Sequence, residues 1–228
     1  MGRLGYERYV SQGGDWGAII SEVMAIQAPA GLLGIHTNMP GTVPPSVVKL
    51  VRNGEPVPSG FSDAEKAAFA SLDYFYNKGF GYAEMMNTRP QTLGYALADS
   101  PVGMAAFFYE KFAAWTHSGD EPERSLTKDE MLDDITLYWL TNTGASSSRS
   151  YWEAAQLGGP LNAVDIPTVP VAVTVFPGEI YRAPRSWAEQ NFHNLIYWNE
   201  VDKGSHFAAW EQPDILADEV RAAFRSLR

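Results

Sequence analysis

The residues best suited to chemistry form the run Gly13-Gly14-Asp15-Trp16-Gly17. A β-prone stretch from Tyr6 to Gln12 precedes it, and a stretch with an apolar helical face, from Ala18 to Ile26, follows it. A sharp strand-to-helix turn can expose a reactive side chain only if the residues two before and two after it are small. Glycine stands at both positions. The pattern therefore predicts that Asp15 lies at a helix N-terminus, whose partial positive charge favours an ionised carboxylate able to attack carbon.

A carboxylate nucleophile leaves an ester of itself, so the enzyme also needs a base to activate the water that hydrolyses this ester. His206 can be that base, and Glu179 can be the acid that orients it. Each follows an apolar run, and the chain order is nucleophile, acid, histidine. The other loop that could carry the acid, after Leu32–His36, holds Thr37-Asn38 and no carboxylate. We therefore favour Glu179.

A parallel sheet would bring these residues together. Three short apolar runs have the character of buried parallel strands: Leu32–His36, Val169–Phe176 and Leu195–Asn199. A closing helix is expected from Pro213, with an apolar face made of Ile215, Leu216, Val220, Phe224 and Leu227. This alternation predicts an α/β fold.

The middle of the chain has a different character. From about Pro44 to about Gly159 the sequence predicts helices and no strand. Their starts carry capping residues, namely Ser62 with Glu65, Ser100 before Pro101, and Thr127 with Glu130. The helix after Thr127 should place Met131, Leu132, Ile135, Tyr138 and Trp139 on one face. We therefore expect residues 1–43 and 160–228 to form the core and residues 44–159 to form a helical cap.

Composition narrows the classes of function. The chain has 228 residues, 45% of them hydrophobic, which is enough for a sizeable core. A net charge of −10 disfavours nucleic acid and anionic lipid as partners, and the lack of cysteine excludes thiolate chemistry. The N-terminus has no apolar run long enough for a signal peptide or membrane anchor, so a cytoplasmic location is expected.

Several motifs together resemble the microsomal-type epoxide hydrolases of the α/β-hydrolase superfamily, and the resemblance covers almost the whole chain. They are Tyr9-Val10-Ser11-Gln12 before the Asp15 run, His36-Thr37-Asn38-Met39-Pro40, Asp99-Ser100-Pro101-Val102-Gly103, Phe176-Pro177-Gly178-Glu179-Ile180 and Gly204-Ser205-His206-Phe207-Ala208-Ala209.

The resemblance implies a mechanism and a substrate class. Asp15 would attack an epoxide carbon, and water activated by His206 and Glu179 would release a vicinal diol. Two cap tyrosines, Tyr82 and Tyr151 by motif match, would donate hydrogen bonds to the epoxide oxygen. The backbone amide of Trp16 would form half of the oxyanion hole. The expected partners are a small hydrophobic epoxide and water, without metal or organic cofactor.

The beginning of the chain departs from the family pattern. Family members begin with further strands and a His-Gly-x-Pro loop that supplies the other oxyanion amide, whereas Met1-Gly2-Arg3-Leu4-Gly5-Tyr6 resembles the helix before the elbow strand. We therefore expect an N-terminally truncated core whose elbow strand lies at a sheet edge, where a homo-oligomer could form.

Two alternatives stay open. One is a haloalkane dehalogenase, in which an Asp-Trp pair like Asp15-Trp16 also serves at the elbow and the indole binds halide. The other is a catalytically impaired fragment that folds in part or binds a hydrophobic ligand. Four further tyrosines of the helical segment compete with the two chosen: Tyr76, Tyr95, Tyr109 and Tyr138.

Overall fold

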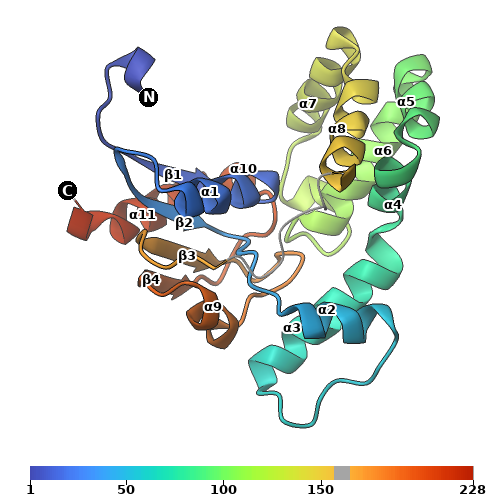
Figure 1. Ribbon diagram of the computed structural model, residues 1–228. Coiled ribbons are helices and arrows are strands. Elements are labelled where there is room, and N and C mark those ends of the chain that lie inside the picture. The colour runs from blue at the N-terminus through green and yellow to red at the C-terminus, as the bar shows by residue number, and fades with distance from the viewer. Residues whose placement is uncertain (157–164, 228) are drawn as a thin grey trace. The chain divides into compact units, whose positions relative to one another are not determined.

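A computed structural model describes residues 1–156 and 165–227 (Figure 1). Four strands, β1 (Tyr9–Gly13), β2 (Leu32–Thr37), β3 (Val171–Val175) and β4 (Leu195–Glu200), form one parallel sheet in the order β1-β2-β3-β4. Every residue of β3 is buried, as its run of valines predicts for a central parallel strand. The expected α/β fold with a parallel sheet is confirmed.

Helices cover both faces of the sheet. Val171, Val173 and Val175 point to one face, where they pack with residues of α1 (Trp16–Gln27) and α9 (Arg185–Asn191). Ala172 points to the other face, against α11 (Pro213–Ala223). This alternation follows from the two-residue period of a strand.

The closing helix is shorter than its apolar pattern suggested. It ends at Ala223, and the last turn, η4 (Arg225–Leu227), is a 3-10 helix. Phe224 and Leu227 nevertheless pack on the same face of the sheet as Ala223. Two further short elements are η1 (Gly2–Leu4), which precedes β1, and α10 (Ala208–Glu211), which precedes α11.

The chain divides into two compact units. Unit 1 combines Met1–Asp73 with the described part of Leu161–Arg228, and unit 2 is Tyr74–Pro160. The helical segment that begins after residue 43 is therefore shared, because α2 (Pro45–Arg52) and all but the last residue of α3 (Asp63–Tyr74) lie in unit 1. The second expected boundary, between residues 159 and 160, lies outside the described residues.

Unit 2 is helical throughout its described part. Its elements are the π-helical turn η2 (Phe75–Gly79), α4 (Gly81–Thr88), α5 (Pro90–Asp99), α6 (Pro101–Trp115), the 3-10 turn η3 (Pro122–Arg124), α7 (Lys128–Thr141) and α8 (Gly144–Gln156). Figure 1 shows α4, α5 and α8 side by side.

The predicted helix starts carry the expected caps. Ser100 Oγ accepts a hydrogen bond from Gly103 N at 3.0 Å. Thr127 and Glu130 form a reciprocal capping box, and so do Ser62 and Glu65. The predicted apolar face of α7 is only partly correct, because Leu132 is 54% exposed.

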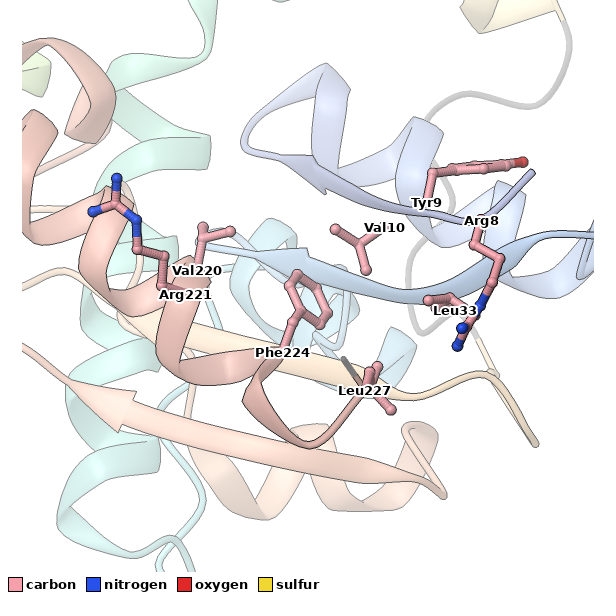
Figure 2. A pocket seen from close by; sticks show the side chains of 8 residues that line it. All are labelled: Arg8, Tyr9, Val10, Leu33, Val220, Arg221, Phe224 and Leu227. Atoms are coloured by element: carbon pink, nitrogen blue, oxygen red, sulfur yellow. The ribbon is translucent and has the colours of Figure 1, made fainter. Parts of the chain in front are cut away.

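A groove of about 390 Å³ lies beside β1, which pairs only with β2 among the described residues. Figure 2 shows its apolar lining, from Val10 and Leu33 to Phe224 and Leu227, with Arg8 and Arg221 toward opposite ends. The elbow strand thus lies at the sheet edge. In the described part of the chain, no helix is both long and apolar enough to cross a bilayer.

Candidate active site

The turn between β1 and α1 holds Asp15 in an unusual backbone conformation. Its φ is 50° and its ψ is −127°, a region that non-glycine residues rarely adopt because the Cβ atom is crowded. The surrounding structure must therefore hold the residue in place. Such strained positions concentrate at functional sites.

Close packing explains two of the three glycines in this turn. A Cβ atom on Gly13 would lie 2.0 Å from the carbonyl oxygen of Gly17, and one on Gly14 would lie 2.7 Å from the side-chain amide of Asn38. A Cβ atom on Gly17 would meet nothing within 4 Å, so the expectation that this position requires glycine for space is wrong. The steric requirement lies at Gly13 and Gly14 instead.

The carboxylate of Asp15 is held at both oxygens. Oδ1 accepts a hydrogen bond from Trp16 N at 2.6 Å, and Oδ2 lies 3.1 Å from His206 Nε2. Burial alone would raise the pKa of Asp15, but the hydrogen bond and charge of His206, with the Trp16 amide, outweigh it and lower the pKa. The side chain is still 39% exposed, so an ionised carboxylate faces accessible space.

Glu179 holds the other side of the His206 ring. His206 Nδ1 lies 2.6 Å from Glu179 Oε1, and both side chains are almost fully buried. Burial opposes a charge on His206, but the charge of Glu179 and the hydrogen bonds to Asp15 and Glu179 raise its pKa to about 10. The structure thus places the ring of His206 between Asp15 and Glu179, and this ring is an imidazolium at neutral pH.

Contacts between two loops fix the acid relative to the base. Gly178 N donates to Gly204 O at 3.1 Å, and Ser205 Oγ donates to the carbonyl of Gly178. Ile180 N donates to Glu179 Oε1 at 2.8 Å. The first two bonds join the loop after β3 to the loop after β4, and the third holds the carboxylate within its own loop, so the distance between acid and base depends on them.

A third loop holds the second oxygen of the acid, and sequence reasoning missed it. Asn38 Nδ2 donates to Glu179 Oε2 at 3.3 Å, while Asn38 Oδ1 accepts from Gln12 Nε2 at 3.2 Å. The sequence drew attention to Asn38 only because no carboxylate stands there. Its position just after β2 was the available signal, since the carboxyl ends of parallel strands meet at one edge of a sheet.

The two tyrosines lie together within unit 2. The ring centroids of Tyr82 and Tyr151 are 6.0 Å apart, with an interplanar angle of 76°. Tyr82 also packs edge-on against Trp115, and Lys111 Nζ lies 4.1 Å from the centroid of the Tyr82 ring. The pair therefore belongs to an aromatic cluster built from α4, α6 and α8.

Comparison with known proteins identifies relatives of the whole chain. No family model matches it. It is 51% identical over 229 residues to a putative epoxide hydrolase of Stigmatella aurantiaca (strain DW4/3-1), covering 100% of this chain and 49% of that protein. It is 34% identical over 243 residues to epoxide hydrolase 1 of Sus scrofa, covering 97% of this chain and 52% of that protein.

Solved structures agree with these relatives. The juvenile hormone epoxide hydrolase of the silkworm Bombyx mori matches with a TM-score of 0.83 and 33% identity, over 100% of this chain and 57% of that one. An epoxide hydrolase of Aspergillus niger matches with a TM-score of 0.81 and 28% identity, over 100% of this chain and 55% of that one.

The parallel sheet, the elbow and these structural matches define an α/β-hydrolase fold. Within that fold, the chain is a homologue of the epoxide hydrolases, similar to them throughout its length. It spans about half the length of the curated relatives it matches.

Proposed function

We propose that the chain carries the catalytic residues of an epoxide hydrolase, which opens a small hydrophobic epoxide with water to a vicinal diol. The observation that supports this most is the carboxylate of Asp15 at the strained elbow, lined up with His206 and Glu179. Relatives named as epoxide hydrolases favour an epoxide over a haloalkane as the substrate.

The first step is the attack of Asp15 on an epoxide carbon. A bond forms between Asp15 Oδ2 and this carbon, the ring C–O bond to this carbon breaks, and the epoxide oxygen becomes an alkoxide that stays bonded to the neighbouring carbon. Following the family resemblance, we assign to Tyr82 and Tyr151 the hydrogen bonds that stabilise this alkoxide and supply its proton. The tyrosine pair of the helical unit provides two phenol groups that can act on one oxygen.

The second step is hydrolysis of the ester. His206 Nε2 takes a proton from water, and the resulting hydroxide adds to the Asp15 carbonyl carbon. The carbonyl oxygen is the former Oδ1, which already lies 2.6 Å from Trp16 N, so this amide is positioned to stabilise the oxyanion. Collapse of the tetrahedral intermediate regenerates the carboxylate and releases the diol.

The charges around His206 order the two steps. In the resting enzyme the carboxylates of Asp15 and Glu179 raise the His206 pKa to about 10, so His206 is a cation. Ester formation removes the negative charge of Asp15 and its hydrogen bond, so the pKa of His206 falls and its Nε2 proton is released to solvent, while the tyrosinate left by the first step takes up a proton from solvent. The base therefore becomes available once the ester that needs it has formed.

The test is to trap and locate the ester. A His206→Gln variant incubated with a simple aryl epoxide should gain the mass of one epoxide, and peptide mapping should place it on Asp15. An Asp15→Asn variant should neither trap the ester nor form diol, whereas Asp218→Asn, an exposed carboxylate, should behave like the parent. An adduct elsewhere, or diol formation at the parent rate by Asp15→Asn, contradicts the proposal. Halide release from a bromoalkane without epoxide turnover would instead support the dehalogenase.

A further inference from the structure

One buried carboxyl group plays no part in these steps. Glu22 lies on α1 and is fully buried. Its Oε1 accepts a hydrogen bond from Gly41 N at 2.8 Å, and Oε2 has no hydrogen-bond partner among the described residues. Burying a carboxyl group with so few partners costs free energy, and here burial raises its pKa to about 7.

The partner of Glu22 belongs to the loop that leaves β2, which also carries Asn38. This loop is held from a second side, because the hydroxyl of Tyr181 donates to the carbonyl oxygen of Pro40. Tyr181 follows Glu179 by two residues in the loop after β3. The segment from Pro40 to Gly41 is thus fixed between α1 and the loop of the acid.

The fixed segment determines where Asn38 can lie. Asn38 is buried, donates to Glu179 Oε2 at 3.3 Å, and is packed so closely that Gly14 has no room for a Cβ atom. Gly41, which bonds to Glu22, follows Asn38 by three positions. A shift of this segment would therefore move the amide that holds the second oxygen of Glu179.

We propose that Glu22 is a positioning residue for the catalytic acid: it holds Gly41, which keeps Asn38 against Glu179 and so fixes the orientation of His206. This inference rests on the proposed function, and it assigns to Glu22 a role in the second step of that function, the hydrolysis of the ester. Glu179 and His206 activate water against the ester, whereas the attack on the epoxide belongs to Asp15. Loss of the Glu22 contact should slow hydrolysis of the ester and leave its formation largely unchanged.

The kinetic experiment separates these two rates in single turnovers of the 228-residue chain with a simple aryl epoxide. Glu22→Met keeps a similar side-chain volume but removes the acceptor, and should slow ester hydrolysis roughly 10- to 100-fold, as expected for a small misplacement of a catalytic group. The ester should accumulate, so kcat and KM fall together. Glu22→Gln keeps an oxygen for Gly41 N and should restore the parent rate of hydrolysis.

Ser21→Ala is the matched control. Ser21 is a buried polar residue of the same helix whose hydroxyl bonds to Ser11 Oγ at 2.8 Å rather than to Gly41. It should leave both rate constants unchanged. A merely structural role of Glu22 would lower the fraction of active protein in Glu22→Met while both rate constants per active site stayed the same, and this result would overturn the proposal.

A second readout needs no turnover. The NMR titration of His206, assigned by comparison with His206→Gln, reports how well Glu179 holds the ring. The pKa should be lower in Glu22→Met than in the parent and unchanged in Glu22→Gln. If Glu22→Met does not fold, Tyr181→Phe loosens the same segment from its other side and should lower the pKa likewise.

An unchanged His206 pKa in the folded variant overturns the positioning role, whatever the kinetics. A lowered pKa in a chain that traps no ester would support the positioning role while contradicting the proposed function, so the two failures are distinguishable.

Discussion

At the nucleophile, backbone conformation and close packing constrain the same residues. The positive φ of Asp15 directs its carboxylate toward His206, and the chain on either side is packed too closely for extra atoms. Gly14 links this packing to the acid, because a Cβ atom there would meet the amide of Asn38, which bonds to Glu179.

Gly14→Ala should therefore reduce activity by displacing Asn38 from Glu179. The new Cβ atom would lie 2.7 Å from the amide, so the side chain of Asn38 has to move. We expect a loss of roughly 10- to 100-fold in diol formation, because the acid is displaced although it is still present. Gly17→Ala is the control, since its Cβ atom has open space and alanine is a better helix former by up to roughly 1 kcal/mol. Equal losses in the two variants would contradict this explanation.

The charge of His206 yields a prediction about Asp15. Asp15→Asn removes one negative charge beside the ring but keeps the shape of the side chain, so the pKa of His206 should fall below about 10. An NMR titration measures this directly. Asp165→Asn removes a carboxylate that pairs with His193 and should leave His206 unchanged. A His206 pKa that is the same in Asp15→Asn would mean that the ester intermediate does not release the base as proposed.

At the scale of elements, local signals in the sequence predicted the structure well. The valine-rich run of β3 and the capping pairs of the helices depend on residues close together in the chain, and each lies where it was expected. The division into units was harder to predict, because α2 and α3 are helical like the cap yet belong to unit 1. Periodicity reports that a helix has an apolar face, but not which element covers it.

The candidate site likewise has a part that the sequence predicts and a part that it does not. Asp15, Glu179 and His206 could be predicted from the sequence, because each is a residue of the required chemical type that follows a predicted strand. The contacts of Asn38, Gln12 and Glu22 could not be predicted from the sequence, because they depend on which loops meet in space. A buried glutamate on a helix looks in the sequence like any solvent-facing glutamate.

One carboxylate bonds α11, the helix on the other face of the sheet, to both β3 and β4. Glu219 of α11 accepts hydrogen bonds from Thr174 Oγ1, Tyr197 OH and Asn199 Nδ2, at 2.9 to 3.0 Å. Glu219→Ala would leave three donors without this acceptor and should destabilise the protein by about 2 kcal/mol, measured by urea unfolding. Asp218→Ala, at an exposed neighbour, should change stability far less. Equal effects of the two substitutions would show that the Glu219 hydrogen bonds do not stabilise the protein.

At the scale of the whole molecule, two buried groups give stability opposite dependences on pH. Burial lowers the pKa of His36 from 6.5 to about 4, and burial raises the pKa of Glu22 from 4.5 to about 7. Both are fully buried, so each shift corresponds to on the order of 3 kcal/mol at its full extent. The contribution of His36 is complete above pH 6.5 and is lost as the pH falls toward 4. That of Glu22 is complete below pH 4.5 and is lost as the pH rises toward 7.

These two losses overlap between about pH 4.5 and 6.5 and offset one another there, so the parent's free energy of unfolding should change little across that range. The active-site pair does not disturb this window: the stability contributed by the raised pKa of His206 is lost only above pH 6.5, and that contributed by the lowered pKa of Asp15 is lost only below pH 3.8. Glu22→Gln removes one of the two dependences. It should become less stable as the pH falls from 6.5 to 4.5, because the charging of His36 is then no longer offset.

His36→Asn removes the other dependence, and should instead become less stable as the pH rises from 4.5 toward 7. Urea unfolding of the parent and both variants at pH 4.5, 5.5 and 6.5 measures how the free energy of unfolding of each protein changes with pH. In the double variant this free energy should again change little with pH. Because the two side chains lie on different elements and have no hydrogen bond to one another, their effects should add. Slopes of the same sign in the two variants would show that at least one of these groups does not change its protonation on folding as its burial requires.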